Sequence, residues 1–162
     1  AFKDAGFFCH QTCIWVKNSP VLGRCDYQYT HEPVLVGWKP TAGHKFYADR
    51  KQRTTWNFDR PTKSQYHPTM KPLALVAYPI TNSSLTNSLV LDPFGGSGST
   101  LIACEQTDRI CYMIELDEKY ADVIVKRFIE QVTSDKEVFL LRDGVKIKYS
   151  DIKKEGEEID LP

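Results

Sequence analysis

The 162-residue chain is long enough for one domain with its own core, and 41% apolar with 26% charged residues is typical of globular proteins. The formal net charge is zero, so the chain as a whole gives no electrostatic argument for a polyanionic partner. No apolar run approaches the roughly 18 residues of a membrane span, and the first residues lack a secretory signal pattern. We therefore expect a single cytoplasmic domain, residues 1–162, without a membrane partner.

Two strand-like segments come first in the chain. Residues 12–18 and 32–39 are rich in β-branched and aromatic residues, and a polar segment with Pro20 and Gly23 separates them. This pattern predicts an antiparallel hairpin with a long connection, within a hairpin region 1–39. The chain starts without methionine in a segment typical of a helix end capped by Gly6, which favours a piece of a longer protein.

The next region, residues 40–66, is basic and aromatic and has no clear periodicity. Between Lys39 and Lys71 the sequence has eight basic and two acidic residues, a local balance of +6. Such a segment suits a polyanion, although a solvated surface loop has the same composition. We predict an irregular loop region that contacts a polyanionic partner.

Five cysteines are spread over the chain, and an odd number without a secretory signal favours free thiols. Cys9 and Cys13, with Cys25 and His31 further on, lack the spacing of a zinc site. We expect buried thiols and no metal.

A helix and then a strand–helix–strand–helix series follow in residues 67–132. Pro72 marks the start of the first helix, Leu89–Leu91 form a short buried strand, and a helix covers residues 99–107. Arg109–Leu116 form a second apolar strand, and the last helix begins at an Asp117 N-cap. This order predicts the α/β class with parallel strands. Residues 133–162 predict a C-terminal hairpin, turning at Asp143-Gly144, and a tail.

The link between the first of these strands and its helix reads "DPFGGSGST", residues 92–100. Glycines there bring backbone amides close to a ligand, and Glu115 at the end of the next strand can accept both hydroxyls of a ribose. The third glycine of a dinucleotide fingerprint is replaced by Leu101, and no P-loop lysine is present. Asp92 would repel a pyrophosphate but suits the ammonium group of S-adenosylmethionine. A tight turn without ligand is the alternative.

This turn, the "HPTMKP" that precedes it and the "CYMIELDEKYADVIVKR" that follows it resemble the DNA amino-methyltransferases. The likeness covers about residues 1–131 and is greatest to the permuted class, in which the target-base motifs precede the cofactor motifs. It implies a partial Rossmann-like methyltransferase fold, S-adenosylmethionine as cofactor, double-stranded DNA as partner and a bacterial or phage restriction-modification setting. It further implies methyl transfer to the exocyclic amine of a base, adenine favoured over cytosine.

The resemblance also implies site residues. The glycine turn would wrap the methionine end of the cofactor, Glu115 and Leu116 the adenosine, and the "HPTMKP" motif the carboxylate. The full cofactor set is Thr69, Lys71, Asp92, Phe94, Gly95, Gly96, Ser97, Gly98, Glu115 and Leu116. For Lys71 a surface position and for Phe94 a core position are the alternatives.

The DNA-contacting set implied by the basic region is Arg50, Lys51, Arg53, Trp56 and Arg60. Packing is the alternative for Trp56. His31, Glu32 and Trp38 are candidates for the target-base pocket, although strand alternation alone does not determine which face each takes.

The family's reaction needs Asp, Asn or Ser followed by Pro-Pro and an aromatic residue, and no stretch of the chain matches this motif. In the permuted class it would lie upstream of Ala1, so we expect no catalytic residue here and a chain inactive alone. The strand at residues 89–91 would then lack a neighbour and pair with another chain or a missing N-terminal half. A non-catalytic cofactor- or DNA-binding remnant is the first alternative, and a nicotinamide- or flavin-dependent oxidoreductase the second.

Overall fold

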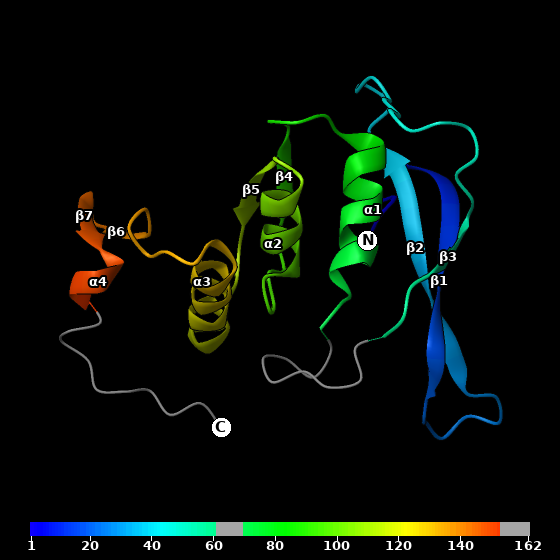
Figure 1. The fold of residues 1–162 in the computed structure, drawn as a ribbon. Helices are drawn as coiled ribbons and strands as arrows, with labels where there is room; N and C mark the ends of the chain where they lie inside the picture. The colour runs from blue at the N-terminus through cyan, green and yellow to red at the C-terminus, as the bar shows by residue number, and fades with distance from the viewer. Residues whose placement is uncertain (61–69, 153–162) are drawn as a thin grey trace.

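The computed structural model describes residues 1–60 and 70–152 (Figure 1). A three-stranded sheet lies at one end, a C-terminal hairpin lies at the other, and helices with a two-stranded sheet lie between them. The elements in chain order are β1 Phe8–Val21, β2 Tyr29–Trp38, β3 Thr55–Asn57, α1 Leu73–Ser83, β4 Leu89–Asp92, α2 Ser99–Gln106, β5 Ile110–Met113, α3 Glu118–Val132, β6 Phe139–Arg142, β7 Val145–Lys148 and α4 Tyr149–Ile152.

The first sheet has the strand order β2-β1-β3. β1 and β2 pair antiparallel, as predicted, and extend the hairpin beyond the predicted segments, from the pair Phe8 and Trp38 to the pair Val21 and Tyr29. β3 pairs parallel with β1 inside the region predicted to be irregular. That prediction is wrong for residues 55–57, because a three-residue strand shows too little alternation to be recognised in a sequence.

The core of this first unit lies between the sheet and α1. Cys13, Trp15, Trp56 and Leu75 are buried together, with Trp15 only 2% exposed. The Trp15 indole Nε1 donates a hydrogen bond of 2.8 Å to the Phe58 carbonyl, which satisfies its polar atom. The helix that the sequence predicted after Pro72 therefore covers the sheet.

The second unit is the β4–α2–β5–α3 series. β4 and β5 pair in parallel from Leu89 and Ile110 to Asp92 and Met113, which confirms the predicted α/β unit. α2 is closely packed, since Cys104 is fully buried. The predicted N-cap of α3 is also confirmed: the Asp117 carboxylate accepts a hydrogen bond from the Lys119 amide.

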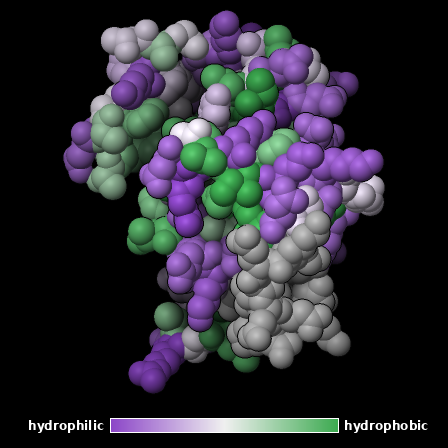
Figure 2. Space-filling model, turned by 90° about the vertical axis from the view of Figure 1, so that its left-hand side faces the viewer, coloured by the Kyte–Doolittle hydropathy of each residue, from purple (hydrophilic) through white to green (hydrophobic). Residues whose placement is uncertain are grey.

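One face of the β4–β5 sheet is exposed, so the expectation of a buried strand at Leu89–Leu91 is wrong for its two leucines, because nothing in the described part of the chain packs over that face. Successive side chains of a strand point to opposite faces, and those on this face are 65% exposed at Leu89, 68% at Leu91, 46% at Ile110 and 59% at Tyr112. We call these four residues the exposed sheet face. Figure 2 shows apolar residues at the surface on the side of the molecule that carries α3 and the C-terminal hairpin.

The C-terminal hairpin β6–β7 turns where the sequence predicts. Asp143 and Gly144 have φ angles of 52° and 78°, the positive values of a type I′ turn. Within residues 1–60 and 70–152, no helix is both long and apolar enough to cross a membrane.

The cysteines divide by burial. Cys13 and Cys104 are buried, but Cys25 is exposed, so the expectation of buried thiols is wrong at that position. Burial raises the pKa of the Cys111 thiol to about 12, and the neighbouring Cys104 adds to the shift. In the described part of the chain, no three His, Cys, Asp or Glu side chains are grouped as metal ligands would be.

Candidate functional site

The glycine turn between β4 and α2 has a backbone that restricts its residue types. Gly96 and Gly98 have φ angles of 53° and 77°, in the left-handed region. A Cβ on Gly98 would lie 3.1 Å from Ile124 of α3, and one on Gly95 would lie 2.7 Å from the Met113 sulfur of β5. Two of the predicted cofactor residues, Gly95 and Gly98, therefore let the turn pack against β5 and α3.

Asp92 holds the turn closed. One carboxylate oxygen accepts a 3.0 Å hydrogen bond from the Phe94 amide, and the other accepts a 2.6 Å hydrogen bond from the Thr100 hydroxyl. Sequence reasoning missed Thr100, although its place in the first turn of α2, eight residues after an acid, is a usable signal. Asp92 thus joins the end of β4 to the start of α2.

Glu115 joins the turn to α3. Its Oε2 accepts a 2.6 Å hydrogen bond from the Gly96 amide, and its Oε1 accepts a 2.9 Å hydrogen bond from the Asp117 amide. The two amides thus bind different oxygens of the same carboxylate. The predicted ribose-binding acid is therefore fixed between the turn and the N-terminus of α3.

A hollow of about 630 Å³ opens beside Glu115, within the range of small-ligand pockets. Four predicted cofactor residues line it, and Phe94 and Leu116 are 86% and 99% exposed. Phe94 is thus not a core residue in this structure. The complete lining is Pro93, Phe94, Gly96, Ile114, Glu115, Leu116, Asp117 and Tyr120, of which sequence reasoning missed Pro93, Ile114, Asp117 and Tyr120.

Ser97 lies on the inner side of the turn. It is buried, and its carbonyl accepts a hydrogen bond from the Arg127 guanidinium of α3. Its hydroxyl lies 3.4 Å from the Ser99 hydroxyl. The structure therefore places Ser97 as a support of the turn, and adds the buried Arg127, which the sequence pattern of α3 gave no reason to select.

Lys71 departs from its expected place. Its ammonium lies 2.7 Å from Glu32 Oε2, whereas its backbone carbonyl accepts a long, 3.4 Å hydrogen bond from the Ser99 hydroxyl of α2. The side chain is therefore directed to β2 and not to the glycine turn. Thr69, the other residue expected near the cofactor carboxylate, lies outside the described residues.

A second hollow, of about 440 Å³, lies between β1, β2 and the start of α1. His31 and Glu32 both line it, as do Lys71 and Arg60. Trp38 does not join them, because its ring stacks on His44 with the centroids 3.9 Å apart. Of the three candidates for a target-base pocket, the structure brings two together.

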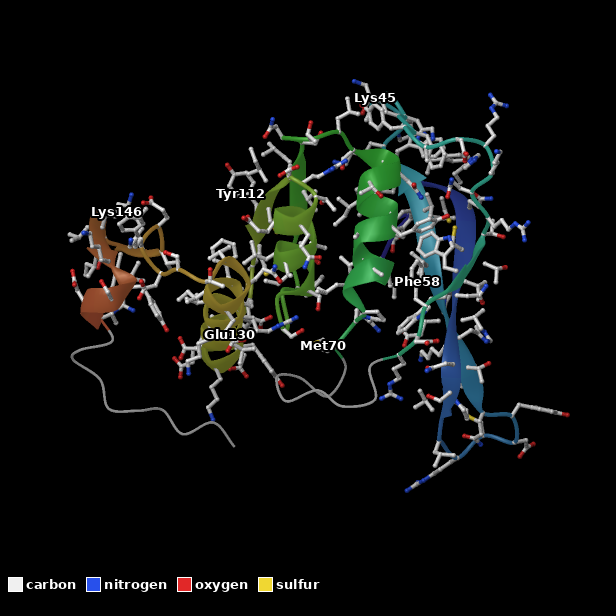
Figure 3. All side chains as sticks on the ribbon, viewed as in Figure 1. Lys45, Phe58, Met70, Tyr112, Glu130 and Lys146 are labelled. Atoms are coloured by element: carbon white, nitrogen blue, oxygen red, sulfur yellow. The ribbon has the colours of Figure 1, made fainter. Side chains whose placement is uncertain are left out.

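The predicted DNA-contacting residues lie in different settings, and Arg50, Lys51 and Arg53 share one of them while Trp56 has another. Arg50, Lys51 and Arg53 are exposed between β2 and β3, on the segment whose Lys45 lies at the outer edge of the molecule in Figure 3. Trp56 is 7% exposed, and its Nε1 donates to the Arg53 carbonyl at 2.9 Å. Its burial argues against the predicted DNA contact and favours packing.

Arg60 lies in a third setting. It is half-buried at the second hollow, and its amide donates to the Asn18 side-chain oxygen at 3.0 Å.

The chain is similar to proteins of a known family. The sequence profile of the DNA methylase family of N6 and N4 methyltransferases matches residues 1–126. The type II methyltransferase M.SmaI of Serratia marcescens is 28% identical over 148 residues, 81% of this chain and 50% of its own length. M.HinfI of Haemophilus influenzae is 29% identical, and the match covers 89% of this chain and 46% of its own length. The chain thus spans about half the length of these relatives.

Solved structures give the same result. The M1.HpyAVI–SAM complex matches with a TM-score of 0.66 and 31% identity, over 78% of this chain and 64% of that chain. The cytosine-N4-specific PvuII DNA methyltransferase, at 19% identity, has a TM-score of 0.60 over 78% of this chain and 53% of its own, which shows the shared fold alone. With the family profile covering most of its residues, the chain belongs to the DNA methylase family.

Proposed function

We propose that this chain is the cofactor-binding half of an S-adenosylmethionine-dependent DNA methyltransferase. The observation that carries the proposal is the Glu115 carboxylate, fixed by the Gly96 and Asp117 amides at the edge of a nucleoside-sized hollow. The M1.HpyAVI structure, which this chain resembles, is a complex with SAM. The enzyme would move a methyl group to the exocyclic amine of a base in double-stranded DNA.

The lining of the hollow fits S-adenosylmethionine. Glu115 would accept hydrogen bonds from the ribose hydroxyls, and the exposed Phe94 and Leu116 offer apolar surface to the adenine. Bound there, the cofactor supplies an electrophilic methyl group on a sulfonium. Asp92, held by Thr100 and the Phe94 amide, places a negative charge at the turn toward the cofactor's positively charged end.

The same charge disfavours a nicotinamide dinucleotide. A pyrophosphate at this turn would meet the Asp92 carboxylate, and Leu101 stands where a dinucleotide fingerprint has its third glycine. We therefore favour methyl transfer over an oxidoreductase function.

Catalysis would need residues beyond the 162 of this sequence, because the Asp/Asn-Pro-Pro-aromatic motif is absent from it. We propose that a further segment, in the order of the permuted class, or a second chain supplies this motif. The exposed sheet face supports this, since a parallel strand such as β4 is usually covered on both sides. Until such a segment is joined to it, the chain can act as a cofactor- or DNA-binding module without turnover.

For the DNA, we propose that Arg50, Lys51 and Arg53 bind phosphates, since they are exposed on the most basic segment of the chain. Adenine is the proposed acceptor base, with cytosine as the alternative. Transfer of labelled methyl groups to duplexes with only one of the two bases modifiable distinguishes them, when this chain is joined to a segment that carries the motif.

The cofactor proposal is tested by isothermal titration of the full chain with S-adenosylhomocysteine and, separately, with NAD. We expect saturable binding of S-adenosylhomocysteine and none of NAD. Binding of NAD in its place would move the assignment to the oxidoreductases.

A further inference from the structure

A charged cluster outside the cofactor hollow joins the first sheet to the segment that leads into α1. Glu32 of β2 lies 2.7 Å from the Lys17 ammonium with one oxygen and 2.7 Å from the Lys71 ammonium with the other. The Lys17 side chain is 5% exposed and that of Lys71 is 44% exposed. Both ammonium groups lie about 5 Å from the centroid of the Trp15 ring, 5.3 Å and 5.1 Å respectively. One carboxylate thus holds two cations against the same aromatic face.

The electrostatics keep this carboxylate ionised. Burial alone would raise the pKa of Glu32, but the hydrogen bonds and positive charges of Lys17 and Lys71 outweigh burial and lower the pKa. An ionised carboxylate has acceptors for both ammonium groups, whereas a neutral amide in its place has one acceptor oxygen. The cluster therefore depends on the charge of Glu32 as well as on its shape.

Lys71 connects this cluster to the glycine turn through the backbone. It immediately precedes Pro72, the N-cap of α1, and its carbonyl accepts from the Ser99 hydroxyl at the first residue of α2. Figures 1 and 3 show α1 and α2 side by side, with Met70 at the lower end of α1. The segment that Glu32 holds thus contacts the helix that begins at the cofactor turn.

We propose that Glu32 is a positioning residue for cofactor binding. By fixing the Lys71 ammonium on β2, Glu32 holds the segment before α1 against the first turn of α2. Lys71 then supports the site through its backbone carbonyl, and its ammonium group does not bind the cofactor. The expected effect on cofactor affinity rests on the proposed function. The contact between the segment before α1 and α2 does not depend on that function.

Glu32→Gln separates the two lysines. The one remaining acceptor oxygen stays with Lys17, because leaving a buried ammonium unpaired costs more than releasing the half-exposed Lys71 to water. We expect Glu32→Gln to weaken S-adenosylhomocysteine binding by roughly 5- to 20-fold, a usual range for coupling between sites. Lys71→Met should weaken it equally, and the double variant should bind no worse than either single one.

Lys17→Met is the matched control, since it removes the other cation and leaves the Lys71–Glu32 pair intact. Its affinity should stay within about twofold of the unmodified chain, because that pair still holds the segment before α1. Unchanged affinity in Glu32→Gln would overturn the inference, because the Lys71–Glu32 pair would then have no effect on the site. Tighter binding would also overturn it, because a freed Lys71 would then reach the cofactor carboxylate. Equal weakening in Lys17→Met and Lys71→Met would also overturn it. If Glu32→Gln does not fold, the two lysine variants make the same comparison.

Hydrogen exchange of the full chain without ligand tests the positioning role of Glu32 independently of the proposed function. Faster amide exchange in Glu32→Gln at both residues 70–76 and residues 99–103 supports the positioning role. Changes confined to β1 and β2 overturn it. If the unmodified chain fails to bind S-adenosylhomocysteine, the proposed function fails, and the exchange result alone decides this inference.

Discussion

Both units of this chain bury one side of their sheet and expose side chains on the other, with Leu35 50% exposed in the first unit, but they differ in where the candidate cofactor residues lie. In the first, α1 closes the core over the sheet, and Trp15 and Trp56 are 2% and 7% exposed. In the second, α2 and α3 bury Cys104 fully on one side of β4–β5, while Leu91 is 68% exposed on the other. The first unit holds little of the candidate cofactor site, and the second unit holds the glycine turn and Glu115. The candidate cofactor site therefore lies apart from the tryptophan core of the first unit.

This difference has a sequence origin. The residues of β5 are mostly apolar, as expected of a parallel strand covered on both faces. Substitutions in the two units should therefore have different effects.

Trp15→Ala should cause the largest loss. It removes the most buried tryptophan of the closed core and should lower the free energy of unfolding by about 3–5 kcal/mol. Urea denaturation followed by circular dichroism measures the loss. A loss below about 1 kcal/mol would mean that the first unit is not closed as described.

Gly98→Ala should follow. Left-handed strain costs about 1–2 kcal/mol, and the added Cβ at 3.1 Å from Ile124 brings overpacking of about 1–3 kcal/mol. Gly144→Ala is the matched control, since its φ of 78° is nearly the same and no atom lies within 4 Å of the added Cβ. Equal losses in the two variants would show that the turn is not packed on α3.

Thr100→Val should lower stability by about 1.5–3 kcal/mol, the usual range for a hydrogen bond to a charged group, and weaken cofactor binding with it. The change removes the 2.6 Å bond to Asp92 at nearly constant volume. Thr107→Val, which breaks a hydroxyl bond to Ala103 at the other end of α2, is the control for stability without an effect on affinity. If both variants bind S-adenosylhomocysteine normally, Asp92 does not organise the site through Thr100.

Acid and alkali should affect different units. The pKa of Glu32 is lowered in the folded chain, so its stabilisation is present above the ordinary value of about 4.3 and is lost as pH falls below it. The pKa of Cys111 is raised to about 12, so its contribution is present below pH 9.0 and is lost as pH rises toward 12. Hydrogen exchange should show β1–β2 loosening first in acid and β4–β5 first in alkali. The reverse order would contradict both assignments.

Leu91→Lys should have the smallest effect on the chain alone, within about 0.5 kcal/mol, because the side chain is already exposed. Leu75→Lys, in the closed core, should prevent folding. When a segment carrying the missing motif is supplied, Leu91→Lys should prevent its association while leaving cofactor binding unchanged. Normal association of Leu91→Lys would remove the exposed sheet face as the docking surface.

Much of the fold follows from local patterns. The hairpin, the parallel β4–β5 unit, the Asp117 cap and the Asp143-Gly144 turn depend on nearby residues, so the sequence is enough to predict them. β3 and the burial of Trp56 depend on contacts with β1, some 40 residues away, and no local pattern encodes them.

The site divides in the same way. Glu115 and the glycines follow from spacing, whereas the attachment of Lys71 to Glu32, 39 residues earlier, and the support from Arg127 arise only when the elements pack. Long side chains such as these can reach several partners, so their positions are the hardest to infer from sequence.

The central claim is that Glu115 holds the ribose of S-adenosylmethionine, and titration of Glu115→Gln with S-adenosylhomocysteine tests it most directly. We expect that the unmodified chain binds and that Glu115→Gln binds roughly 10- to 100-fold more weakly, since it loses charge-assisted hydrogen bonds. Glu118→Gln, an exposed acid three residues further on, should bind as the unmodified chain does. Equal affinity of Glu115→Gln and the unmodified chain would contradict the account.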